Sequence, residues 1–92
     1  MSIALLEVDF TSAIASDPVA LSGGFNLSLD FTTGSGVGTV ELQRSFDKGV
    51  TWETVDSKTA DAEENGNANG NLLWRLNCTA FTSGTISGRL EQ

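Results

Sequence analysis

The feature that most restricts the fold of this chain is a strict alternation of apolar and polar residues in segment 25–32. Four apolar positions alternate with four polar ones: Phe25, Leu27, Leu29 and Phe31 against Asn26, Ser28, Asp30 and Thr32. Successive side chains of a β-strand point to opposite faces, so this period predicts a strand with one buried and one solvated face. No segment keeps the apolar spacing of an amphipathic helix over two turns. We therefore predict an all-β protein.

Strands of the same kind are predicted along most of the chain. Alternating or short apolar segments fall at residues 1–10, 37–46, 51–55, 72–81 and 85–92. Pro18 has no N–H to donate, so any strand around it must lie at a sheet edge. Residues 56–71 are polar and rich in glycine and asparagine, which predicts a long loop with room for a short edge strand in its first half. About five to seven short strands, with turns roughly every 8–12 residues, indicate an antiparallel sandwich or, as the alternative, a small barrel.

Two glycine-bearing turns between these segments predict β-hairpins. The first matches S-x-D-x-G-x-T-W, the Asp-box hairpin of sialidases and related propellers, at every defined position: Ser45, Asp47, Gly49, Thr51 and Trp52. We expect Gly49 to supply a positive φ, and the Ser45 and Asp47 side chains to satisfy turn amides. A propeller needs many repeated blades and this chain holds one copy, so the match indicates a local structure and not a glycosidase. The second turn, residues 82–84, joins the last two predicted strands.

Composition excludes several classes of function. The chain has 12 acidic and five scattered basic residues, for a net charge of −7, whereas a groove that binds phosphates needs clustered Lys and Arg. No apolar run approaches the roughly 20 residues of a membrane span. The N-terminus lacks a basic stretch, so we expect no signal peptide and assembly in a cytoplasm. Cys78 is the only cysteine, which excludes an intrachain disulfide and predicts a small buried side chain.

The acidic segment that begins at Asp61 matches a calcium-binding loop in part. Oxygen-bearing side chains fall at positions 1, 3, 5 and 9 of such a loop: Asp61, Glu63, Asn65 and Asn69. Position 12, normally a bidentate glutamate, is Leu72, and no helix is predicted on either side. A solvated or partner-facing loop is therefore the preferred interpretation, and Ca²⁺ binding is the weaker one.

The residue types offer little for catalysis. The chain has no histidine and no tyrosine, and the sequence places no base beside Cys78 or any serine. No glycine-rich loop opens a helix, so no phosphate-binding cradle is predicted. We expect a protein without enzymatic activity and without a cofactor.

Three segments carry a resemblance to a known group. They are GGFNL at 23–27, TVELQRSFDxGxTW at 39–52 and LWRLxCTAFTSGTI at 73–86. Together they resemble small proteins encoded among the virion structural genes of tailed bacteriophages and prophages. The resemblance covers residues 20–92 and implies the B, C, C′, F and G strands of an immunoglobulin- or fibronectin-III-like sandwich. Residues 1–19 match nothing in that group and are expected to form an N-terminal arm or an edge strand.

The resemblance implies a non-enzymatic virion protein, such as a head-decoration protein that stabilises the capsid, assembled in the host cytoplasm. Its partner would be the major capsid protein or another virion protein, and a homo-oligomer, with a trimer favoured, is expected. Strand edges, the N-terminal segment and loop tips are all candidate contact surfaces. The alternative is a carbohydrate- or surface-binding module on a tail or fibre, which needs an exposed face on Trp52 or Trp74. A third and weaker possibility is an enzyme scaffold that a larger catalytic partner completes.

Overall fold

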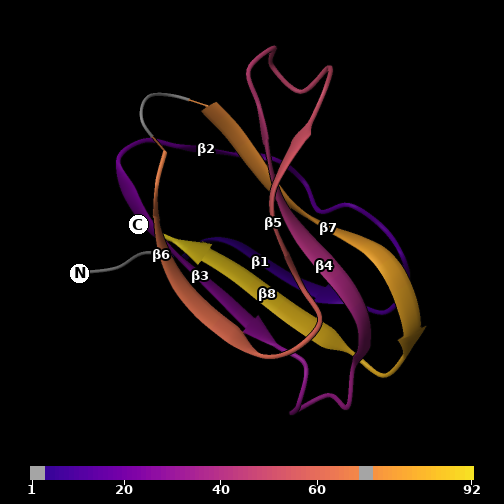
Figure 1. The fold of residues 1–92 in the computed structure, drawn as a ribbon. Coiled ribbons are helices and arrows are strands. Elements are labelled where there is room, and N and C mark those ends of the chain that lie inside the picture. Colours follow the sequence, from indigo (N-terminus) through magenta and orange to yellow (C-terminus); the bar gives the residue numbers. More distant parts are fainter. Residues whose placement is uncertain (1–3, 69–71) are drawn as a thin grey trace.

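The computed structural model describes residues 4–68 and 72–92, whose strands form two sheets (Figure 1). In chain order the strands are β1 (Ala4–Phe10), β2 (Val19–Leu21), β3 (Gly24–Asp30), β4 (Val37–Ser45), β5 (Glu53–Lys58), β6 (Ala62–Asn67), β7 (Leu72–Ser83) and β8 (Ile86–Glu91). Sheet I has the order β1-β8-β3-β6 and sheet II the order β2-β7-β4-β5, and all of these pairs are antiparallel. The predicted all-β sandwich is confirmed, with eight strands in the described residues. None of these residues belongs to a helix long and apolar enough to cross a membrane.

The core lies between the sheets and follows the alternation in the sequence. In β3, Phe25, Leu27 and Leu29 are buried. They join one apolar cluster with side chains from sheet II: Leu21, Val40, Leu42, Trp74, Leu76 and Cys78. The Phe25 and Trp74 rings connect the two sheets directly, with centroids 4.9 Å apart. Burying each large apolar side chain contributes about 1.5–3 kcal/mol, so this cluster is the main source of stability. Cys78 is buried, as predicted.

The predicted β4–β5 hairpin is present. Its register runs from Val40 opposite Lys58 to Arg44 opposite Glu53, with a bulge after Leu42. The connection between the two strands, residues 46–52, extends beyond both sheets at the top of the view in Figure 1.

The predicted β7–β8 hairpin is wrong. β7 pairs with β2 and β4 in sheet II, whereas β8 pairs with β1 and β3 in sheet I, so residues 84–85 cross from one sheet to the other. A strand has two edges, and both edges of β7 are already occupied. In the immunoglobulin order the last strand lies in the sheet of the strand before it, but here it lies beside β3. The sandwich is therefore confirmed with a different partner for its last strand.

The long loop predicted at 56–71 is also wrong. β5, at the edge of sheet II, continues to Lys58, and β6 forms the edge of sheet I against β3. Gly66 does not mark a turn, since it lies within β6, where a Cβ would collide with the Phe25 ring. The glycine is needed for close packing of an edge strand on an aromatic side chain. Residues 69–71 lie outside the described residues.

The N-terminal segment contributes to both sheets. β1 is the edge strand of sheet I next to β8, and β2 is an edge strand of sheet II, as expected near Pro18. Just before Pro18, Ala15 forms an isolated bridge with Asn77, and Ser16 Oγ accepts a hydrogen bond of 3.0 Å from the Leu76 N–H. The segment from Ala15 to Leu21 therefore follows the outer edge of β7, interrupted at the proline.

Candidate functional site

The β4–β5 hairpin is closed by its own polar side chains. Ser45 Oγ donates to Asp47 Oδ1 over 2.7 Å and accepts the Gly49 N–H over 2.8 Å. The Thr51 N–H donates to Asp47 Oδ1 over 2.9 Å, and the Thr51 hydroxyl donates to Asp47 Oδ2. Lys48 and Gly49 both have positive φ, of 60° and 92°. Serine and aspartate thus replace the backbone partners that a tight turn lacks.

The ionised Asp47 carboxylate accepts hydrogen bonds from within this hairpin. The Thr51 hydroxyl, the Thr51 N–H and the Ser45 hydroxyl together lower the pKa of Asp47 from 3.8 to about 2. Hydrogen bonds to the charged form of a carboxylate stabilise that form, which is the cause of the shift. The folded turn therefore keeps its carboxylate ionised at pH values at which an ordinary aspartate takes up a proton.

The side chains that point out of this hairpin are largely apolar. Phe46 is 60% exposed and Val50 is 81% exposed. The remaining exposed large apolar residues of the described chain, Ile14, Val37 and Val55, lie on other segments. We call residues 46–51 the hairpin tip. Isolated exposed apolar residues are common, but two on one projection that is closed by its own hydrogen bonds form a candidate contact surface.

Two arginines stack on aromatic rings near the base of the hairpin tip, from opposite faces of sheet II. The Arg44 guanidinium lies 5.0 Å from the centre of the Phe46 ring, and the Arg75 guanidinium lies 4.3 Å from the centre of the Trp52 ring. Arg75 Nε also donates to Gln43 Oε1 over 2.8 Å, which fixes the guanidinium over the indole. With Lys48 in the tip, three of the five basic residues of this acidic chain lie at the same end.

The two tryptophans differ in exposure. Trp74 is 2% exposed. Trp52 is half-buried at the base of the hairpin, with Arg75 on one face of its ring. The S-x-D-x-G-x-T-W match does not anticipate the stacked arginine, because Arg75 is distant from Trp52 in the sequence.

The predicted calcium ligands are not brought together. Asp61 accepts hydrogen bonds from the Phe31 N–H (2.7 Å), the Thr32 N–H (3.0 Å) and the Thr32 hydroxyl (2.8 Å), and these bonds lower its pKa. Glu63 and Asn65 are exposed on the extended strand β6, and Asn69 lies outside the described residues. Within residues 4–68 and 72–92, no group of three or more His, Cys, Asp or Glu side chains could hold a metal ion. Asp61 instead fixes the chain as it leaves β3.

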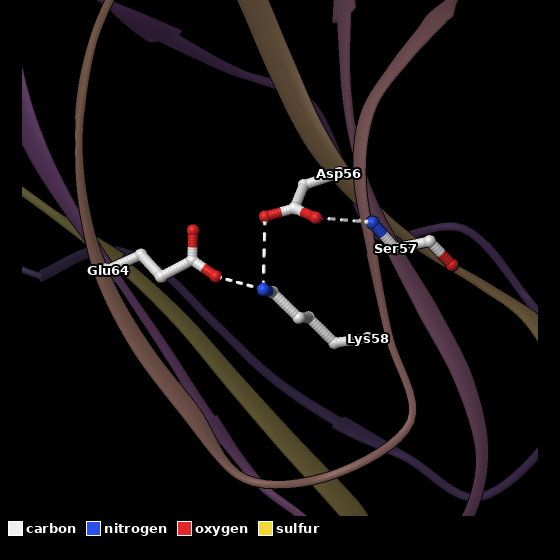
Figure 2. Close-up of polar contacts among 4 residues, drawn as sticks. All are labelled: Asp56, Ser57, Lys58 and Glu64. Carbon is white, nitrogen blue, oxygen red and sulfur yellow. Dashed lines mark hydrogen bonds and ion pairs between the residues drawn. The ribbon is translucent and has the colours of Figure 1, made fainter.

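A second polar cluster joins the two sheets at the edges formed by β5 and β6 (Figure 2). Lys58 Nζ lies 3.3 Å from Asp56 Oδ2 and contacts Glu64 Oε1. Glu64 and then Asp56 raise the pKa of Lys58. Desolvation acts to raise the pKa of Asp56, but the Ser57 N–H and Lys58 outweigh it, so that pKa is lowered. Sequence reasoning misses this cluster because it assigns residues 56–71 to a loop.

Comparisons with known proteins identify no relative. No family model matches the chain, and neither a curated protein nor a solved structure matches it.

Proposed function

We propose that this chain is a non-enzymatic structural protein of a phage virion, which binds the capsid lattice through the hairpin tip. The observation that supports it most is the combination of a closed polar network around Asp47 with outward-facing Phe46 and Val50. The resemblance of residues 20–92 to virion proteins is the reason for proposing a virion, and the hairpin tip is the proposed contact surface.

The stiffness of the tip favours binding. Ordering a flexible loop on association costs free energy, and a turn that is already closed avoids much of this cost. Aromatic residues and arginine are enriched at the centres of protein interfaces, and here Phe46 lies against Arg44. An apolar tip with Arg44 stacked on Phe46 therefore fits a shallow apolar depression on a partner protein.

Repetition would strengthen a small contact. A tip of this size buries too little area for a stable one-to-one complex. On a capsid, an oligomer of this chain would engage several identical sites at once, and linked sites raise the overall affinity by orders of magnitude. A homo-oligomer, with a trimer favoured, is part of the proposal, and the solution mass of the purified protein measures it.

Sedimentation with undecorated capsids tests the proposal. Wild-type protein at micromolar concentration should co-sediment, and the double variant Phe46→Ser/Val50→Ser should bind at least about tenfold more weakly. Val37→Ser is the matched control, because Val37 is 53% exposed at the opposite end of β4, and it should bind like wild type. All three proteins should unfold within about 0.5 kcal/mol of one another, since the changed side chains are exposed. Failure of wild type to co-sediment, or equal binding by the double variant, would contradict the proposal.

A further inference from the structure

Arg75 lies on the outer face of sheet II and is held there by two contacts. Its neighbours in β7, Trp74 and Leu76, are buried in the core, so the Arg75 side chain points away from it. The Arg75 guanidinium lies 4.3 Å from the centre of the Trp52 ring, and its Nε–H donates to Gln43 Oε1 over 2.8 Å. A guanidinium that is stacked and hydrogen-bonded in this way keeps one orientation, so little entropy is lost when it binds a ligand.

The Gln43 amide is oriented in turn by its own neighbours. Gln43 is 7% exposed, and its Nε2 group donates to Glu41 Oε1 over 3.0 Å and to Thr54 Oγ1 over 3.3 Å. The opposite orientation of the amide would set its NH₂ group against the Arg75 Nε–H and its oxygen against the Glu41 carboxylate. Because a glutamine oxygen has no formal charge, Gln43 fixes the arginine without neutralising it.

The positive charge of Arg75 has no carboxylate partner in the part of the chain that the structure describes. Arg89 forms ion pairs with Glu7 and Glu91, whereas Arg75 forms none with any described residue. Partial burial lowers the pKa of Arg75, which means that its charge is partly removed from water. Such a charge gains more from an opposite charge than a fully hydrated one does.

The two Nη groups of Arg75 are open to solvent. They have no hydrogen-bond partner among the described residues, and the buried side-chain donors that lack one there are Arg44 Nε and Trp74 Nε1. The Nη groups of Arg75 are therefore not buried. The two groups of a guanidinium lie in one plane, so together they present a fork of N–H donors to an approaching ligand.

From this arrangement we infer that Arg75 binds the carboxylate of a glutamate or aspartate side chain on a partner protein. A carboxylate is planar and accepts the N–H groups of both Nη atoms in parallel. Its single negative charge matches the single cation, whereas a phosphate dianion would bring a second negative charge toward the network that contains Glu41. The inference does not rest on the function proposed for the hairpin tip.

A protein side chain is the favoured source of the carboxylate. One arginine holds a free small acid only weakly, because the ion pair must offset the whole entropy loss of association. Within a protein interface that cost is shared among many contacts. Tryptophan and arginine are the residues that most often dominate such interfaces, and here Trp52 and Arg75 lie against each other.

Trp52 reports directly on this binding, since its ring lies against the guanidinium. In ¹H–¹⁵N spectra of ¹⁵N-labelled protein at constant ionic strength, Trp52→Phe identifies its indole signal. N-acetylglutamate methylamide should shift this signal in a saturable way, with half-saturation on the order of 50 mM. N-acetylglutamine methylamide has the same shape without the charge and should leave the signal unchanged. Equal shifts with the two ligands, or no saturable shift with either, would overturn the inference.

Two further anions test the identity and the source of the ligand. Acetate carries the carboxylate without a peptide unit, and it should bind more weakly than the glutamate derivative. Acetate binding of equal or greater strength would contradict a protein side chain as the source. Inorganic phosphate should also bind more weakly, and tighter binding of phosphate would contradict the assignment to a carboxylate.

Arg75→Gln tests the arginine itself. The variant loses the guanidinium, so binding of N-acetylglutamate methylamide should weaken at least about tenfold. Arg89→Gln is the matched control, because it makes the same change at an arginine that already pairs with Glu7 and Glu91, and it should bind like wild type. Unchanged binding in Arg75→Gln, or equal losses in the two variants, would overturn the assignment. If Arg75→Gln does not fold, the four ligands on the wild-type protein still decide the inference.

Discussion

The two ends of β4 are fixed in different ways. Beyond its C-terminal end, the hairpin tip is closed by residues 45–51 alone, through the side chains of Ser45, Asp47 and Thr51. Before its N-terminal end, the chain passes from sheet I to sheet II, and it is held there by a segment distant in the sequence. The Thr85 N–H donates to the Gly34 carbonyl over 3.0 Å, and Ser35 forms a bridge with Thr85.

Because of this difference, the side chains at the hairpin tip can vary, whereas the residues at the other end of β4 cannot. The hairpin tip satisfies its backbone from within, so Phe46 and Val50 are free to face a partner. At the other end of β4, the β3–β4 connection and the β7–β8 connection both pass from one sheet to the other. The two connections hold each other in place, and their backbones lie very close together. A Cβ on Gly84 would collide with the carbonyl of Ser35. A turn that is closed by nearby side chains leaves its other side chains available for binding. A turn that is held by a distant segment has its backbone covered by that segment.

The largest expected effect comes from Gly84→Ala, which tests the long-range closure. Gly84 has φ 78°, and an added methyl group also meets backbone atoms of Gly34 and Ser35. We expect a loss of about 2–5 kcal/mol, as the sum of left-handed backbone strain and overpacking. Gly23→Ala is the control, since Gly23 has φ 73° but no atom within 4 Å of an added Cβ, and it should lose only about 1–2 kcal/mol. Urea unfolding measures both, and equal losses would mean that the crossing does not hold the two connections together.

A smaller and more local effect is expected from Asp47→Ala, which tests closure from within. The Thr51 N–H loses its acceptor, so its hydrogen exchange should become faster. Exchange at the Thr85 N–H, at the other end of β4, should stay as in wild type. Capsid binding should also weaken, because Phe46 and Val50 are no longer presented by a stiff turn. If exchange at Thr51 does not change, the carboxylate is not what closes the hairpin.

The smallest expected effect concerns pH. The pKa of Asp47 is lower in the folded protein, about 2, than its ordinary value of 3.8. The unfolded chain therefore takes up this proton first as the pH falls, and the stabilising contribution is present above about pH 4 and is lost between about pH 4 and pH 2. Asp47→Asn should lose less stability over this window than wild type. Asp30 and Asp61 also have lowered pKa values, so some slope should remain in the variant. Urea midpoints at pH 5, 3 and 2 check this, and parallel curves for the two proteins would contradict it.

The sequence predicts features that depend on near neighbours. The alternation in β3 and the burial of Cys78 are confirmed, because both follow from the period of a strand with one buried face. The β4–β5 hairpin is confirmed because its turn chemistry is local. Phe46 keeps the apolar alternation of Val40 and Leu42, yet it is 60% exposed, since β4 ends at Ser45 and the chain turns away from the core.

The features that the sequence does not predict depend on distant partners. Residues 56–71 have a loop composition, but Gly66 packs under the Phe25 ring and Lys58 joins Glu64 across the edges of the two sheets. The unsatisfied donors of Trp74 and Arg44 are likewise visible only when β4 and β7 lie side by side. No pattern along the chain reports such contacts.

The amino-acid sequence predicts the strands that have clear apolar alternation, such as β3, and the position of one hairpin turn, because side-chain periodicity and turn hydrogen bonds act over a few residues. The pairing of the strands, in contrast, depends on the whole fold. β7 and β8 look like a hairpin in the sequence, but β2 and β4 already occupy both edges of β7, so β8 crosses to sheet I. The partner at each strand edge depends on all the other strands of the molecule, so strand pairing cannot be predicted from any one segment.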